Sequence, residues 1–130
     1  MIVDVAANHF LGQNGAQKRN CAQSVLCGFK EMLDISEETI DAFAAFGGGR
    51  VPGGTCGAIY AAEYILDRIG APEGKERLKA HMEGCAGSVV CKEIKEKKQL
   101  SCLGCVKEST EVLVSILCPS ADLEKSNQIV

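Results

Sequence analysis

The sequence predicts an all-α protein, a compact bundle of about five to six short helices in a single domain over residues 1–130. Apolar residues recur every three or four positions along most of the chain, as they do on one face of a helix. No segment keeps the alternation of apolar and polar residues that is typical of a half-buried strand. The length suits one domain with a modest core. The two ends of the chain, approximately residues 1–14 and 120–130, are expected to be peripheral to the bundle.

Capping residues and helix breakers separate the helical segments. In chain order, the segments span residues 3–11, which is short and weak, then 19–33, 36–46, 55–69, 72–83, 88–97 and 101–118. The expected N-caps are Ser36, Thr55, Ser88 and Ser101, because their hydroxyl oxygens can accept from the first free backbone N–H groups. Glycine-rich residues 47–54 interrupt the pattern. This loop either brings backbone close to a cofactor or is an ordinary connector.

The helix predicted over residues 19–33 has two cysteines on different faces. At about 100° per residue, Cys21 lies at the edge of the apolar stripe and Cys27 lies on the opposite side. We therefore expect Cys21 to face the interior or a buried site. Cys27 is expected to face solvent or a partner.

Composition argues against several classes of function. The net charge of −3 and the absence of Trp give no basis for binding nucleic acid or an anionic membrane surface. The N-terminal residues have no basic region followed by an apolar run, so they do not resemble a secretory signal. No stretch is long and apolar enough to span a membrane. We expect a soluble, cytoplasmic protein.

Because the cytoplasm is reducing, the eight cysteines are not expected to form a disulfide framework. Metal or cluster binding, dithiol redox chemistry and buried structural thiols all stay open at this point. Four of the cysteines fall in the first turn of a predicted helix: Cys56, Cys91, Cys102 and Cys105. Backbone N–H groups and the helix dipole stabilise negative charge there, and the thiolate is the form that attacks disulfides and binds metals.

Cys102 and Cys105 form a C-x-x-C pair, which suits a redox dithiol, two metal ligands or two apolar thiols in a core helix. Val106 follows the pair in place of the His of a c-type haem motif, which excludes covalent haem. A thioredoxin-like site needs a βαβ context, which is missing here. Simple zinc modules need a second closely spaced pair of cysteines, which is also missing. His81 is expected to be solvent-exposed rather than a ligand.

Five ordered elements form a recognisable pattern. They are Asn20-Cys21-Ala22-Gln23-Ser24-Val25-Leu26, Phe46-Gly47-Gly48-Gly49, Thr55-Cys56-Gly57-Ala58, Cys91 after Gly87-Ser88, and Cys105-Val106. The pattern resembles the putative redox-active protein family named for its cysteine pattern, C_GCAxxG_C_C, and covers about residues 20–117. One departure is Ala61, where the family usually has Gly, although Ala should still allow close helix packing.

The resemblance implies a helical domain with redox or iron–sulfur character. A related domain accompanies haem sites in split-Soret cytochromes, where an iron–sulfur site has been proposed. The family pattern implies four metal ligands: Cys21, Cys56, Cys91 and Cys105. The glycines expected to donate backbone hydrogen bonds to a cluster are Gly48, Gly49 and Gly57. The cysteines outside the family's four are Cys27, Cys85, Cys102 and Cys118.

The expected function is electron transfer or redox sensing through an iron–sulfur cluster; whether the protein is an enzyme stays open. One alternative is a metal-free thiol/disulfide oxidoreductase in which Cys105 or Cys56 attacks. The other is a non-enzymatic helical module with a structural zinc or plain buried thiols. Zinc is the weaker cofactor candidate, and haem is not expected. The expected partner is an unidentified redox protein, and an uncovered apolar patch between short helices could support a homodimer.

Overall fold

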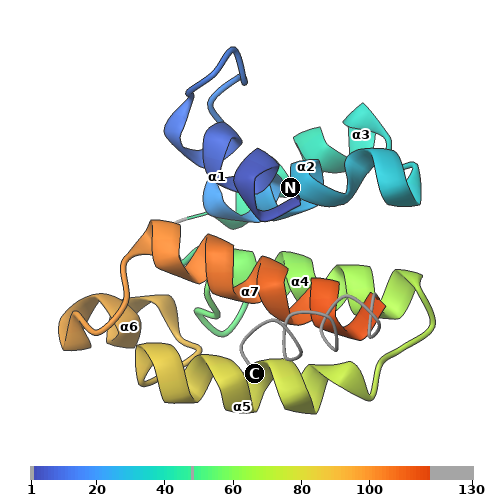
Figure 1. The fold of residues 1–130 in the computed structure, drawn as a ribbon. Coiled ribbons are helices and arrows are strands. Elements are labelled where there is room, and N and C mark those ends of the chain that lie inside the picture. Colours follow the sequence, from blue (N-terminus) through green and yellow to red (C-terminus); the bar gives the residue numbers. More distant parts are fainter. Residues whose placement is uncertain (1, 48, 118–130) are drawn as a thin grey trace, which may run out of the picture.

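The computed structural model describes residues 2–47 and 49–117 and is built from helices (Figure 1). Its elements in chain order are α1 (Ile2–Leu11), α2 (Cys21–Leu33), α3 (Glu37–Ala42), the 3-10 helix η1 (Phe43–Phe46), α4 (Gly57–Arg68), α5 (Gly74–Ala86), α6 (Cys91–Lys97) and α7 (Cys102–Leu117). These residues contain no strand, only an isolated β-bridge between Thr55 and Val90. The all-α prediction is confirmed, with more helices than expected. Cys118 and the segment 120–130 lie outside the described residues.

Helix α7 is the central element of the bundle. It packs against α1, α2, α4 and α5. In Figure 1, α1, α2 and α3 lie on one side of α4 and α7, and α5 and α6 lie on the other side. None of the helices described is both long enough and apolar enough to cross a membrane.

A single hydrophobic core joins the helices. Its fully buried side chains include Phe29 of α2, Leu66 of α4, Met82 of α5 and Leu113 of α7. Burying a large apolar side chain contributes about 1.5–3 kcal/mol of stability. Ala61 of α4 is also fully buried, so its methyl group is accommodated at the position where the family usually has Gly.

Helix α1 is an integral part of the bundle, which corrects the expectation that residues 1–14 are peripheral. Ala6 is fully buried, and α1 packs against both α2 and α7. The two helices approach closely at Gly28, where an added Cβ would lie 3.1 Å from the carbonyl oxygen of Ile2 and 3.3 Å from the Cβ of Ala6. Because α2 is packed on more than one face, Cys27 is only 7% exposed. The prediction that Cys27 faces solvent or a partner is wrong.

The helix starts follow the predicted capping chemistry at some positions and depart from it at others. The Oγ of Ser36 accepts from the N–H of Thr39 at 3.2 Å, and the Oγ of Ser101 accepts from the N–H of Gly104 at 2.9 Å, as predicted. Thr55 and Ser88 are not N-caps; Cys56 and Val90 hold those positions instead. The cause is the Thr55–Val90 bridge, which keeps both segments extended, so the N-cap lies one residue later than predicted in α4 and two residues later in α6.

Candidate functional site

Four cysteines from four helices gather at the N-terminal ends of those helices. Cys21 is the first residue of α2, and Cys91 is the first residue of α6. Cys56 is the N-cap of α4, and Cys105 lies in the first turn of α7. Cys21 therefore shares the helix-start position that the sequence already indicated for the other three. Free backbone N–H groups at such positions favour negatively charged sulfur.

The thiol of Cys56 is at the centre of this group. Side-chain interactions with Cys105 and with Cys21 shift its pKa. Electrostatic interactions with Cys21 and with Cys91 both raise the pKa of Cys105. The structure thus brings together all four cysteines that the family pattern implied. Cys102 is exposed and lies one turn away on α7, and it also raises the pKa of Cys105.

The hydrogen bonds give the two buried thiols opposite tendencies to ionise. Donation from the Cys56 thiol lowers the pKa of Cys105, and burial and the neighbouring cysteine charges oppose that effect. Donation to Cys105 raises the pKa of Cys56 to about 12; burial adds to this rise, while the hydrogen bond from Cys21 opposes it. Cys105 therefore loses its proton more readily than Cys56 does.

A short backbone clamp sets Cys56 beside Cys91. The N–H of Cys56 donates to the carbonyl of Val89 at 2.8 Å, and the N–H of Cys91 donates to the carbonyl of Gly54 at 2.9 Å. The Thr55–Val90 bridge lies between these two hydrogen bonds. The starts of α4 and α6, which are distant in sequence, are consequently held next to each other.

Asn20 and Arg50 hold the glycine turn against the start of α2. The side chain of Asn20 caps α2 in a capping box with Gln23, and its Nδ2 donates to the carbonyl of Ala44 at 3.1 Å. The guanidinium of Arg50 donates to the carbonyl of Gly47 at 2.8 Å and to that of Ala44 at 3.0 Å. The position of Cys21, next to its cap, is thereby tied to the conformation of the turn.

Two of the three predicted cofactor-binding glycines lie against cysteine sulfurs. A Cβ at Gly57 would lie 2.7 Å from the Sγ of Cys21 and 2.5 Å from the carbonyl oxygen of Phe46, so no side chain fits there. Gly49 has a φ of +83°, and a Cβ there would lie 3.6 Å from the Sγ of Cys91. Gly48 lies outside the described residues.

The donor set suits a soft metal or an iron–sulfur cluster, because both are held by thiolates. In a tetrahedral site with Zn–S bonds of about 2.3 Å, the sulfurs are about 3.8 Å apart. Among the described residues, no three of these cysteine sulfurs lie within 4.8 Å of one another, since the only such group of potential ligands lies elsewhere. The sulfurs are thus spread more widely than the ligands of one zinc ion.

A helical bundle with a partly buried cluster of free cysteines defines a class of protein suited to thiol or metal-based redox chemistry. The model of the putative redox-active protein family C_GCAxxG_C_C matches residues 19–116, so the chain belongs to this family. The resemblance seen in the sequence is thereby confirmed. No curated protein and no solved structure matches the chain.

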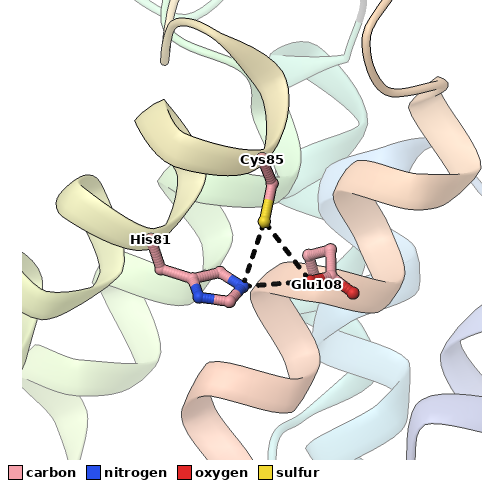
Figure 2. Close-up of side chains that lie close together, drawn as sticks. All are labelled: His81, Cys85 and Glu108. Atoms are coloured by element: carbon pink, nitrogen blue, oxygen red, sulfur yellow. Dashed lines mark hydrogen bonds and ion pairs between the residues drawn. The ribbon is translucent and has the colours of Figure 1, made fainter.

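A second group of potential ligands lies between α5 and α7, where the sequence indicated none (Figure 2). It consists of His81 and Cys85 on α5 and Glu108 on α7. His81 is solvent-exposed, as predicted, but it is not isolated. The i, i+4 spacing of His81 and Cys85 was the one signal in the sequence, since it places both side chains on one helix face. Glu108 joins them only through packing of α7 against α5.

Proposed function

We propose that this member of the redox-active family binds an iron–sulfur cluster through Cys21, Cys56, Cys91 and Cys105 and serves in electron transfer or redox sensing. The observation that carries the proposal is the meeting of cysteines at helix starts, where the side chain of Cys56 interacts with those of Cys21 and Cys105. Cys91, at the start of α6, is held next to Cys56 by the backbone clamp to Gly54. Thiol donors from four different helices, gathered in one region of the fold, are what ligation of an iron–sulfur cluster requires.

The residues around the cysteines prepare the site in distinct ways. Cys105 offers a thiolate first, and Cys56 must release its proton to become a ligand. Burial of both side chains keeps water away from the sulfurs. Gly57 leaves room for the sulfur of Cys21, and Gly49, with its positive φ, forms the turn that passes next to Cys91. An iron–sulfur cluster, when bound, supplies one-electron redox chemistry whose potential depends on such burial and hydrogen bonding.

The proposal includes a cellular context. Free cysteines persist in a reducing compartment, so we place the protein in the cytoplasm. Its partner is a redox protein that exchanges electrons with the site. The net charge of −3 supports no role with nucleic acid. A homodimer is compatible with the proposal but is not needed for it.

Anaerobic purification followed by iron, sulfide and EPR analysis tests the proposal. The expected result is a coloured protein with iron and acid-labile sulfide in equal amounts and an EPR signal in one oxidation state. Zinc in place of iron, lost when Cys56 is replaced by serine, would support the structural-zinc alternative. Colourless, iron-free protein after anaerobic reconstitution would overturn the cluster.

The contact between Cys56 and Cys105 supports a second candidate, a metal-free thiol/disulfide oxidoreductase. The Cys105 thiolate would attack a substrate disulfide and release one substrate thiol. Cys56, after losing its proton, would then resolve the mixed disulfide and release the second thiol. Cys105 is only 1% exposed, which restricts access for a substrate and ranks this candidate below the cluster. A reversible loss of two thiols on mild oxidation of metal-free protein, with Cys56 joined to Cys105, would favour it.

A further inference from the structure

His81, Cys85 and Glu108 form a compact triangle of three different donor atoms. The Nε2 of His81 lies 3.0 Å from the Oε1 of Glu108. The Sγ of Cys85 lies 3.5 Å from that nitrogen and 3.5 Å from that oxygen. In Figure 2, the three side chains point toward one another from α5 and α7. One nitrogen, one sulfur and one oxygen therefore face a common point.

These distances match those between the ligands of a tetrahedral zinc ion. Bonds of about 2.1 Å to N and O and about 2.3 Å to S place N and O about 3.4 Å apart, and S about 3.6 Å from each. The sulfur distances are already within about 0.1 Å of this geometry. Only the His81–Glu108 pair is closer, and a small side-chain movement would widen it.

We propose that His81, Cys85 and Glu108 bind a zinc ion, at a site separate from the four-cysteine cluster. Imidazole, thiolate and carboxylate together are a borderline-soft donor set that zinc accepts. On binding, the Cys85 S–H bond breaks as the S–Zn bond forms, and the proton passes to solvent. No oxidation or reduction accompanies this step.

The surroundings leave a fourth coordination position. The His81 side chain is 40% exposed and that of Glu108 is 28% exposed, so water can reach the ion. The fourth ligand is therefore water. Three protein ligands with one open position are typical of reactive zinc sites, whereas structural sites are closed.

Zinc at this point would join α5 to α7. Helix α7 also carries Cys105, one turn before Glu108, so the same helix serves both sites. Binding to the folded state alone raises stability in proportion to the logarithm of free zinc. A zinc-dependent rise in the midpoint of thermal unfolding is therefore a readout that requires no enzymatic assay.

Zinc stoichiometry and thermal unfolding test the proposal in the full chain under reducing conditions. The variants are His81→Ala, Cys85→Ser and Glu108→Gln, and the matched controls are Glu83→Gln, at an exposed position on α5, and Cys102→Ser, at an exposed cysteine. Wild type and both controls should bind one zinc equivalent more than each of the three variants. Zinc should raise the unfolding midpoint of wild type by several degrees more than that of the variants. Equal stoichiometry and equal shifts in wild type and His81→Ala would overturn the proposal.

A measurement on the wild-type protein covers the case in which a variant does not fold. Zinc should slow alkylation of Cys85 by iodoacetamide at least tenfold, as followed by peptide mass spectrometry, and a chelator should restore the original rate. An unchanged rate for Cys85 would also overturn the proposal. Because the readout is specific to Cys85, metal at the four-cysteine site does not affect the outcome. Failure of the iron–sulfur proposal would equally leave this test valid.

Discussion

Cys56, at the start of α4, and Cys105, in the first turn of α7, interact through their side chains and shift each other's pKa in opposite directions. This interaction joins two helix N-termini that the sequence places far apart. It lowers the pKa of Cys105 and raises that of Cys56, so the two thiols ionise in a fixed order. Of the two thiols, Cys105 is therefore the one that ionises at the lower pH.

Replacing any one of the four clustered cysteines with serine should reduce the iron content of anaerobically reconstituted protein several-fold. The physical reason is that a hydroxyl is a poorer ligand for iron–sulfur clusters than a thiolate. Cys85→Ser is the matched control, because Cys85 belongs to the other ligand group. Iron and sulfide assays provide the measurement. Full iron content in Cys56→Ser would remove Cys56 from the ligand set.

Gly57→Ala should destabilise the protein by about 1–3 kcal/mol, because the new methyl group overlaps a backbone carbonyl and the sulfur of Cys21. Gly84→Ala, on α5, is the matched control, since an added Cβ there meets nothing within 4 Å. That change should be neutral or stabilising by about 0.4–1 kcal/mol. Urea unfolding of the two variants provides the comparison. Equal stability of both would contradict the close approach at Gly57.

The stability of the reduced, metal-free protein should fall as the pH rises above about 9. The folded-state pKa of Cys56 is about 12, above the ordinary value of 9.0, so its stabilising contribution is complete below pH 9 and is lost between there and pH 12. Each pH unit in this window costs about 1.4 kcal/mol. The lowered pKa of Cys105 acts the other way, but its contribution is already complete above pH 9.

Urea unfolding of wild type and Cys56→Ala at pH 8 and pH 10 would measure this dependence. Lys and Tyr side chains also titrate in this range, and the variant serves as the control because it retains them. The decrease in unfolding free energy should be smaller in Cys56→Ala. An identical decrease in both proteins would show that Cys56 does not hold its proton in the folded state.

Asn20→Ala should weaken both helix capping and the cysteine site. Loss of an N-cap costs about 1 kcal/mol, and Ser36→Ala, which removes the N-cap of α3, should cost a similar amount. Only Asn20 also bonds the turn at Ala44 and packs against Gly47, next to Cys21. Asn20→Ala should therefore reduce iron content, whereas Ser36→Ala should not. Equal iron content in the two variants would show that the Asn20 cap has no effect on the cysteine site.

Several features followed from the sequence because they depend on local interactions. Helical periodicity predicted the all-α class, and capping chemistry predicted the roles of Ser36 and Ser101. The order of cysteine and glycine motifs predicted the family, which residues 19–116 confirm. That Cys21, Cys56, Cys91 and Cys105 serve as ligands stays a prediction, although the fold brings them together.

Other features depend on how helices distant in sequence pack, and local periodicity does not contain that information. The packing of α1 on α2 makes α1 integral to the bundle, and Cys27 is buried in the resulting core, contrary to expectation. The bridge to Val90 takes Thr55 out of its predicted capping role and moves Cys56 into it. Packing of α7 against α5 brings Glu108 to His81 and Cys85. The sequence by itself determined the helices and the number and order of the cysteines, whereas tertiary packing decided which side chains share a site.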